Sequence, residues 1–533
     1  MNNIWQISRE YAGIAEAGGV KNVVCSLSEV LAENDFNVTV FMPLYGCTSF
    51  SCIKDYSEIP DSTVKICVNG TEYDVSFGKA SSRRVNFVFI ISPLFTEKKG
   101  IYTYTEAEEA ENKSHKRGEG HKDAAVMEII FQKAVLEYGK LFNAAPDLVH
   151  CHDATTAMIP VFAKELDVYR DTYNDTGFVV TVHNAGPFYH HEFNSIHTAK
   201  IMTDLPDAVL QKGLRKHFVE PYLLAGFYST LTTVSSWYAE ELMDPNDDKS
   251  DGLSELFFKE KIQIHGITNG IDYDKYNPAD KEVSCLPYEY NPLEKAFDGK
   301  KQCRDYLIQK KIIDEDFYRK NPAPKDSDSI SQFGTFCSME SGDVYFSYHG
   351  RFVHQKGLDI LSKAIPLVLE KNKSVKFIIM GQGSDELEKE QIKLAEKYTG
   401  NIVYFRGYEK ALTRLCVAAA DYIILPSQFE PCGLEDFIAS VLGTVPLAHA
   451  TGGLKKIIDG KTGFLYENNT PEELAEKILS AADFFARNHD GFISMTVAAA
   501  ENVKANYSWE NIVEKGYIPL YKKIIKKIIK PID

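Results

Sequence analysis

Short apolar runs alternate with longer helical patterns along almost the whole chain, and this rhythm restricts the fold more than any other feature. Runs such as "NVTVFMP", "VNFVFII" and "GFVVTVHN" are apolar without interruption. Strands that helices cover on both faces have this pattern, whereas a half-exposed strand alternates polar and apolar residues. "KDAAVMEIIFQKAVLEYGKLF" supplies a helix between two of the runs. The alternation predicts an α/β architecture built on parallel strands.

The rhythm stops in the middle of the chain and then restarts with "DVYFSYHG", "VKFIIMG", "NIVYFRG" and "DYIILPS". A chain of 533 residues is also too long for one ordinary core. We therefore predict two doubly wound domains, residues 1–265 and 266–505. Within the second, the region around 313–342 gathers Pro, Ser, Asp and Lys, and we interpret it as an inserted exposed loop.

Residues 506–533 end in "GYIPLYKKIIKKIIKPID", which places Ile at helical spacing with Lys opposite. A basic amphipathic helix can lie on a membrane surface. A terminal helix that packs its apolar stripe on the body of the protein explains the same pattern, and this is what we expect.

Charge and cysteine usage exclude several classes of protein. A net charge of -16 disfavours a nucleic-acid partner, although a few local cations can still hold a small anionic ligand. The ten cysteines lack metal-binding spacing, which indicates buried free thiols in a reducing compartment. "MNNIWQISREY" is not a secretory signal, and no apolar run approaches the roughly 20 residues of a membrane span. We expect a cytoplasmic protein without a metal or a membrane partner.

Three glycine-containing junctions join a strand to a helix. Gly18-Gly19 stands at the first, "PCGL" at a second and Gly452-Gly453 at a third. Glycines there can let backbone N–H groups approach a phosphate or a sugar oxygen, although a plain tight turn needs them equally. The first is not G-x-G-x-x-G, so a dinucleotide-dependent dehydrogenase is not supported. Together the junctions suggest a cleft that grips an anionic ligand.

Polar residues also follow the predicted strands, where open α/β sheets bind ligands. They are His152, Asp153, His183, Asn184, Arg351, Lys356, Tyr408 and Glu430. Each has a purely structural explanation as well: Arg351 can pair with a surface acid, Asp153 can cap a helix and Tyr408 can pack in a core.

Taken in order, these segments resemble the bacterial glycogen synthase and plant starch synthase family of retaining glucosyltransferases. The similar segments are "EAGGVKNVV", "PDLVHCHDATTAMIPVF", "TVHNAGP", "LTTVSSWYAEEL", "ITNGIDYDKYNPAD", "GRFVHQKGLDIL", "PSQFEPCGLEDF" and "GTVPLAHATGGLKKII". The resemblance implies the GT-B fold, in which two Rossmann-like domains face each other across a cleft. It implies transfer of glucose from ADP-glucose or UDP-glucose to the non-reducing 4-OH of an α-1,4-glucan, with retention of configuration and with no metal or cofactor beyond the nucleotide-sugar co-substrate.

The resemblance also assigns roles to residues. Arg351 and Lys356 match a cationic pair that stabilises the charge on the leaving diphosphate, a task for which fixed cations are suited. Glu430 matches an acid beside the donor glucose, and His183 a residue that contacts the same sugar. The donor-binding set comprises Gly18, Gly19, Asn269, Tyr408, Cys432, Gly433, Leu434, Thr451, Gly452 and Gly453. Asp153 and Asn184 match the acceptor side.

The first half departs from the family pattern. Glu16 stands where the family has the lysine of K-T-G-G-L, and a carboxylate beside a diphosphate must turn away or find a cation. Lys21 can supply charge nearby. Asn22 replaces an aspartate, and Ala154-Thr155 replace Trp-His. Two alternatives stay open: a retaining GT-B transferase with another sugar or acceptor, and a catalytically silent relative that binds glucan or nucleotide.

Overall fold

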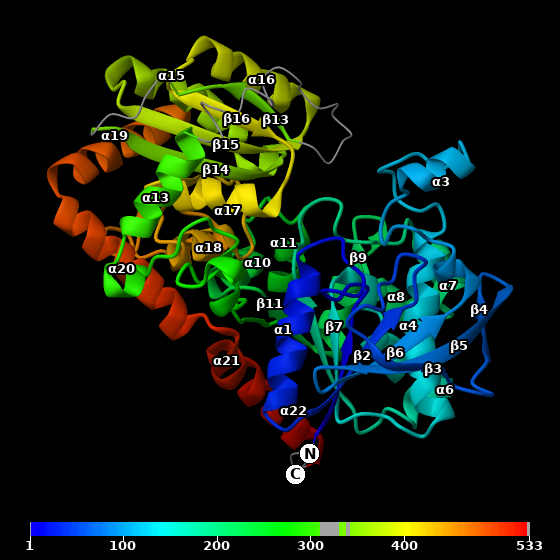
Figure 1. Ribbon diagram of the computed structural model, residues 1–533. Helices are drawn as coiled ribbons and strands as arrows, with labels where there is room; N and C mark the ends of the chain where they lie inside the picture. The colour runs from blue at the N-terminus through cyan, green and yellow to red at the C-terminus, as the bar shows by residue number, and fades with distance from the viewer. Residues whose placement is uncertain (1, 310–329, 337–341, 530–533) are drawn as a thin grey trace. The chain divides into compact units, whose positions relative to one another are not determined.

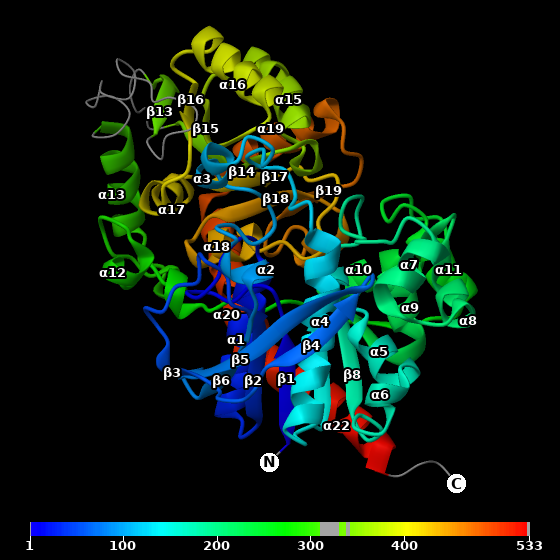
Figure 2. The same cartoon turned by 90° about the vertical axis from the view of Figure 1, so that its right-hand side faces the viewer.

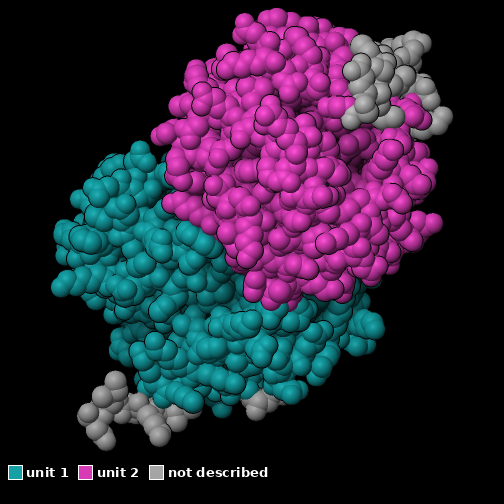
Figure 3. Space-filling view, turned by 90° about the vertical axis from the view of Figure 1, so that its left-hand side faces the viewer, with its two compact units in different colours: residues 1–270, 509–533 teal, residues 271–508 magenta. Residues whose placement is uncertain are grey.

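The computed structural model describes residues 2–309, 330–336 and 342–529. The chain forms two compact units, Met1–Gly270 with Trp509–Asp533, and Ile271–Ser508, which Figure 3 shows in teal and magenta. The second unit is thus inserted into the sequence of the first. The sequence-based limits at 265 and 505 for separate domains stay a prediction.

The first unit is built on a twisted sheet with the strand order β12-β11-β8-β7-β1-β2-β6-β5-β3, with β4 paired to β5 (Figure 1). Neighbours from β12 to β6 are parallel, and β5 runs antiparallel to β6, β3 and β4. The strands are β1 (Asn3–Ile7), β2 (Asn37–Pro43), β3 (Lys54–Glu58), β4 (Val64–Val68), β5 (Thr71–Ser82), β6 (Val85–Ile91), β7 (Leu148–His152), β8 (Gly177–Val182), β11 (Thr230–Thr233) and β12 (Ile264–Gly266), with a separate hairpin of β9 (Leu214–Arg215) and β10 (Phe218–Val219).

Helices of the first unit connect these strands. They are α1 (Val20–Glu33), α2 (Pro93–Thr96), α3 (Glu106–Glu111), α4 (Ala124–Leu141), α5 (Ile159–Glu165), α6 (Asp167–Arg170), α7 (Ile196–Thr203), α8 (Asp207–Leu210), α9 (Pro221–Tyr228), α10 (Ser236–Met243), α11 (Leu253–Lys259), α21 (Trp509–Ile512) and α22 (Ile518–Ile529).

The second unit has a sheet of order β13-β16-β15-β14-β17-β18-β19, parallel except for β13. Its strands are β13 (Ser331–Gly334), β14 (Val344–Phe352), β15 (Val375–Gly383), β16 (Ile402–Arg406), β17 (Tyr422–Leu425), β18 (Val445–His449) and β19 (Phe464–Tyr466). Its helices are α12 (Lys281–Ser284), α13 (Asp298–Tyr306), α15 (Leu358–Lys371), α16 (Asp385–Lys397), α17 (Lys410–Ala419), α18 (Glu435–Val441), α19 (Pro471–Arg487) and α20 (His489–Asn506).

Burial on both faces explains the uninterrupted apolar runs. Along β14, Val344 and Phe346 belong to one hydrophobic cluster, whereas Tyr345 between them belongs to another on the opposite face. Phe377 and Ile378 of β15 divide in the same way. Because successive side chains of a strand point to opposite faces, a sheet between two helical layers needs apolar residues at every position. The prediction of two doubly wound α/β sheets is confirmed.

Five strands of the two sheets were not predicted: β3, β4, β5, β12 and β13. Ser331–Gly334 lies within the expected loop at 313–342, but it forms strand β13, whose Ser331 and Gln332 are buried beside β16. This short edge strand was not predicted because its neighbours in the sequence are polar. The rest of the expected loop falls largely outside the described residues. Likewise, β3 is polar and largely exposed, and β4 alternates exposed and buried residues, so these antiparallel strands lack the continuous apolar signal of the parallel ones.

In each sheet there is one point at which the chain stops adding strands on one side of its first parallel strand and begins adding them on the other side. The loops that follow the strands on both sides of this point lie at the same edge of the sheet. In the first unit this point lies between β1 and β7, and in the second between β14 and β17. Open α/β sheets bind ligands at the carboxyl ends of the strands at such points. These loops are therefore where site residues are expected within each unit.

The helix α22 packs on the first unit, as expected for the amphipathic C-terminal segment. It lies beside β8 (Figure 2). Its Tyr521 and Ile525 are buried. None of the helices described is long and apolar enough to cross a membrane.

The cysteines are only partly as predicted. The nine that the structure describes are all free thiols. However, Cys47, Cys52 and Cys67 are exposed, so the expectation of buried thiols is wrong for these three. Cys47 and Cys52 lie between β2 and β3, and Cys67 lies at an exposed position of the alternating strand β4.

Candidate active site

A buried carboxylate, Glu10, organises the glycine turn that follows β1. Its side chain is 1% exposed and accepts hydrogen bonds from the backbone N–H of Ala17, at 2.9 Å, and of Gly18. Tyr102 donates its hydroxyl to the other carboxylate oxygen at 2.7 Å. The Gly18 amide is thus satisfied within the chain, which corrects our expectation that it is free for a ligand. At Gly19 no atom lies within 4 Å of the place where a Cβ would stand, so this side of the turn has room for a ligand.

Glu16 forms an ion pair with a cation, one of the two outcomes that we expected for its position. One carboxylate oxygen accepts the Gly13 N–H at 2.5 Å, and the other lies 2.8 Å from Lys21 Nζ. Partial burial alone would raise the pKa of the Glu16 carboxyl, but the Lys21 ammonium and the Gly13 amide together lower it. The pair neutralises Lys21, so Lys21 does not supply the free charge that we considered for it.

Asp153 and His183 are joined at the carboxyl ends of β7 and β8. Asp153 Oδ1 accepts the backbone N–H of His183 at 3.0 Å and the hydroxyl of Tyr222 at 3.0 Å. No side-chain cap is seen at Asp153 for the short helical turn that follows, so the capping explanation is wrong. Asp153 also has a φ of 65°, a left-handed conformation that few residues other than Gly adopt without support.

In the second unit, Lys356 and Glu430 meet across the switch point. Lys356 Nζ lies 2.5 Å from Glu430 Oε2, which also accepts the Ser427 hydroxyl at 3.2 Å. Burial lowers the pKa of Lys356, but the Glu430 carboxylate outweighs it and raises that pKa overall. Arg351, at the end of β14, is exposed and forms no ion pair with the described part of the chain. Its guanidinium stays close enough to Lys356 to repel it electrostatically. Glu435, which pairs with His349, also raises the pKa of Lys356, so Lys356 lies near two carboxylates.

Lys456 links the other two glycine junctions by hydrogen bonds to both of them. Its buried Nζ donates to the carbonyls of Cys432 at 2.5 Å, Gly433 at 3.0 Å and Gly453 at 3.1 Å, and it lies 3.0 Å from Asp436 Oδ1. Burial raises the pKa of Asp436 to about 6, against the pull of this ammonium.

The glycines at these junctions have backbone reasons of their own. A Cβ on Gly453 would come within 2.1 Å of the Cys432 carbonyl oxygen, and Gly433 has a φ of 76°. Gly452, with a φ of 44°, begins a short 3₁₀ turn, Gly452–Lys456, rather than the expected longer helix. Close packing of two turns thus accounts for Gly453 before any ligand is considered.

The remaining predicted residues lie in the expected loops but differ in exposure. Tyr408 is 68% exposed, so core packing does not explain it. Asn269 is buried and its Oδ1 has no hydrogen-bond partner in the described structure. Asn184 accepts the Gly186 N–H at 2.7 Å, which closes a local turn. Leu434 packs partly buried at the start of α18, and Thr451 is buried.

Three side chains in these loops escaped the sequence analysis: Glu10, Tyr222 and Lys456. The signal of Glu10 and Lys456 was weak, because a charged residue directly after a buried strand or a glycine pair is usually solvated. Glu10 follows β1 by three residues and Lys456 follows Gly453 by three. Only the burial of Glu10 and Lys456 in the structure shows that each side chain holds the neighbouring turn in place by hydrogen bonds.

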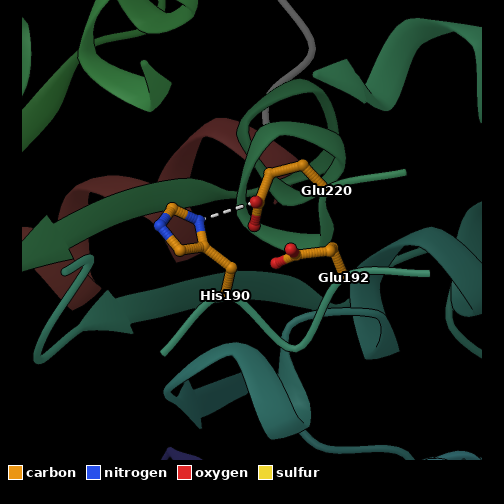
Figure 4. Close-up of side chains that lie close together, drawn as sticks. All are labelled: His190, Glu192 and Glu220. Atoms are coloured by element: carbon orange, nitrogen blue, oxygen red, sulfur yellow. Dashed lines mark hydrogen bonds and ion pairs between the residues drawn. The ribbon is translucent and has the colours of Figure 1, made fainter. Parts of the chain in front are cut away.

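His190, Glu192 and Glu220 point toward one another in the first unit (Figure 4), with possible ligand atoms within 4.8 Å. Arg215 already occupies this cluster: its Nε lies 3.2 Å from Glu220 and its Nη2 3.3 Å from Glu192. His190 Nδ1 pairs with Glu220 at 2.7 Å. Since the guanidinium supplies the positive charge that a metal would, we interpret the cluster as a buried ion network.

Comparisons with known proteins agree with this organisation. Residues 3–257 match the model of the "starch synthase catalytic domain", and residues 343–483 match that of "glycosyl transferases group 1". The chain is 29% identical to a glycogen synthase of Thermodesulfovibrio yellowstonii, over 97% of both chains, and 27% identical to one of Pseudothermotoga lettingae, over 98% of both.

The catalytic domain of starch synthase IV from Arabidopsis thaliana, solved with ADP and acarbose, superposes with a TM-score of 0.78 at 23% identity. The match covers 98% of this chain and 99% of that one. The likeness shows that this chain has the GT-B fold, with its two Rossmann-like sheets. Together, the two matching models and the full-length similarity show that the chain belongs to the glycogen and starch synthase family of glycosyltransferases.

Proposed function

We propose that this protein elongates an α-1,4-glucan by transferring glucose from ADP-glucose or UDP-glucose to the non-reducing 4-OH, with retention of configuration. The observation that carries the proposal is the Lys356–Glu430 pair beside exposed Arg351 at the switch point of the second sheet. Cleavage of the sugar–phosphate bond leaves negative charge on the diphosphate, and fixed cations stabilise that charge as it develops.

Each residue has a role in this proposal. Arg351 can grip two phosphate oxygens with its planar fork, and Lys356 acts as a point charge. Glu430 lies by the donor glucose, where a carboxylate stabilises positive charge that builds up on the sugar ring. His183 contacts the same sugar, and Asp153 orients His183 through its backbone N–H. Tyr408, exposed beside β16, offers a ring for the nucleobase to stack on.

The relatives named above are glycogen synthases, and the starch synthase structure contains ADP and acarbose. These names support a nucleotide-sugar donor and a glucan acceptor for this chain. The proposal includes a cytoplasmic location and no metal or cofactor beyond the nucleotide sugar. The Glu16–Lys21 pair, which replaces a free cation of the family pattern, favours a second candidate, a transferase of the same fold with a different sugar or acceptor.

A transfer assay tests the proposal. The full-length protein is incubated with radiolabelled ADP-glucose or UDP-glucose, with and without glycogen, and with and without a chelator. We expect label in glycogen from at least one donor, released by an α-1,4-specific glucanase and unaffected by the chelator. No transfer to glycogen from either donor would refute the synthase assignment. Donor consumption without glycogen labelling would favour the second candidate, and binding without any turnover would favour a silent relative.

A further inference from the structure

Behind His183 lies a chain of buried polar side chains that the proposed reaction does not use. Gln6 comes from β1, His150 and His152 from β7, and Tyr521 from α22, and each of them is at most 2% exposed. His152 Nδ1 lies 2.9 Å from His183 Nε2, and His152 Nε2 lies 2.8 Å from Gln6 Oε1. The chain therefore leads from the candidate sugar-binding histidine through the core of the first unit to α22.

With its amide oxygen facing His152, Gln6 sets the hydrogen-bond directions along this chain. An amide oxygen can only accept, so His152 must carry its proton on Nε2. A neutral imidazole protonated there has a lone pair on Nδ1, and the nitrogen facing it, His183 Nε2, must donate. His183 is thereby protonated on Nε2, and its Nδ1 carries a lone pair.

Tyr521 contacts the nitrogen of the Gln6 amide. Gln6 Nε2 donates to the Tyr521 oxygen at 3.3 Å, and that oxygen lies 2.6 Å from His150 Nδ1. Because Tyr521 accepts from Gln6, its own proton is free to point at His150. His150 then donates from Nε2 to the Thr181 hydroxyl, 2.6 Å away. Every contact in the chain has one donor and one acceptor.

The histidines of this chain stay uncharged at neutral pH. Burial lowers the pKa of His150 to about 3 and that of His152 well below its usual range, and each ring is further disfavoured as a cation by its neighbours. Burial also lowers the pKa of His183, more than Asp153 raises it. His183 keeps 9% of its surface exposed, and no described residue hydrogen-bonds to its Nδ1.

We propose that Tyr521 and Gln6 are positioning residues that hold His183 as the neutral Nε2–H tautomer, so that its Nδ1 accepts a hydrogen bond from a hydroxyl of the donor sugar. The inference rests on the proposed function for the identity of the ligand, but not for the tautomer. A ring nitrogen that only accepts selects a group that donates. It favours a sugar hydroxyl and disfavours a carboxylate oxygen, so a uronic-acid donor is a poor fit wherever its carboxylate would face Nδ1.

The tautomer can be measured directly in the full-length protein. Nitrogen-15 spectra of histidine-labelled protein, with His183 assigned from a His183→Gln sample, distinguish a protonated ring nitrogen from an unprotonated one. We expect His183 Nε2 to be protonated and Nδ1 unprotonated at neutral pH, with or without ADP-glucose. Protonation on Nδ1, or on both nitrogens, would overturn the proposal even if the protein is an active synthase. Conversely, an inactive protein with the expected tautomer would refute the function alone.

The Tyr521→Phe variant tests the positioning role. It removes the oxygen that Gln6 Nε2 donates to, so we expect the His183 signals to show both tautomers and kcat to fall about tenfold, the smallest loss typical of partners that orient metal-binding histidines. Tyr173→Phe is the matched control, because Tyr173 is also fully buried in the first unit and donates to the Leu136 carbonyl at 2.8 Å, outside this chain. His183 signals that are unchanged in Tyr521→Phe would contradict the proposal.

If Tyr521→Phe does not fold, Gln6→Met gives the same test from the other end. A thioether cannot orient His152, so we expect the same mixture of His183 tautomers. A single unchanged tautomer in this variant would also overturn the proposal.

Discussion

Lys356 Nζ lies 2.5 Å from Glu430 Oε2, although the two residues follow different strands, β14 and β17. The sheet brings them together because β14 and β17 are neighbours at its switch point. The ion pair keeps the lysine charged despite its burial. A cation is thus fixed before a diphosphate arrives, and no reorganisation is required of it during the reaction.

Removing either partner should damage turnover far more than folding. We expect Lys356→Ala and Glu430→Gln each to lower kcat about 100-fold or more, while the free energy of unfolding falls by about 1–3 kcal/mol, because the partner left behind is mostly buried. Steady-state kinetics and urea unfolding measure the two effects. Lys363→Ala, on the exposed face of α15, is the control. Near-normal activity in either site variant would show that its role is wrongly assigned.

Glu16 should weaken donor binding by neutralising Lys21. Glu16→Gln keeps an acceptor for the Gly13 N–H but frees the Lys21 charge, so we expect the KM for the nucleotide sugar to fall about threefold at low salt and the gain to shrink as salt screens it. Glu33→Gln, at the far end of α1, makes the same charge change away from the turn. An equal effect in both variants would mean that only net charge matters.

Lys456 should be required for the stability of the second unit. Lys456→Met leaves Asp436 buried without its partner, and breaking a buried ion pair costs about 3–5 kcal/mol. Circular dichroism during urea unfolding would follow this loss. Lys455→Met is the control, since the neighbouring Lys455 is exposed. Equal unfolding curves for the two variants would contradict a clamping role.

Acid should destabilise the first unit through its buried histidines. His150 has a folded pKa of about 3 and an ordinary pKa near 6.5, so in between only the unfolded chain binds the proton. The free energy of unfolding therefore falls as the pH drops below 6.5, by about 2 kcal/mol at pH 5 from this ring alone. The His152 pKa is lowered too, so it acts in the same direction.

Tryptophan fluorescence measures this effect selectively, because Trp5, Trp237 and Trp509 all belong to the first unit. Urea unfolding at pH 7 and pH 5 gives the pH-dependent difference. We expect His150→Gln to reduce that difference by about 2 kcal/mol. If the variant keeps the full dependence, His150 is not its source.

The sheets were predictable from the sequence because their signal is local. A strand buried on both faces is apolar at every position, as in "NVTVFMP", and β2 occupies those same residues, Asn37–Pro43. The exposed β3, the alternating β4 and the polar edge strand β13 lack that signal.

The candidate site was predictable only in part. The resemblance singled out Arg351, Lys356 and Glu430, and the structure brings Lys356 and Glu430 into contact. The resemblance did not reveal that Glu10 accepts a hydrogen bond from the Gly18 N–H. This contact depends on a charged residue being buried against a turn eight residues away. The link between His150 and Tyr521 spans 371 positions, and no local pattern encodes such a contact.

The insertion of the second unit into the sequence of the first sets an order on folding during synthesis. Residues 271–508 leave the ribosome as one uninterrupted stretch, so the second unit has all of its strands before the first has received α22. Until then His150 lacks its tyrosine partner in the core. The larger part of the first unit is translated first, yet it completes its packing last, and a nascent chain stalled before residue 521 would expose that gap to chaperones and proteases.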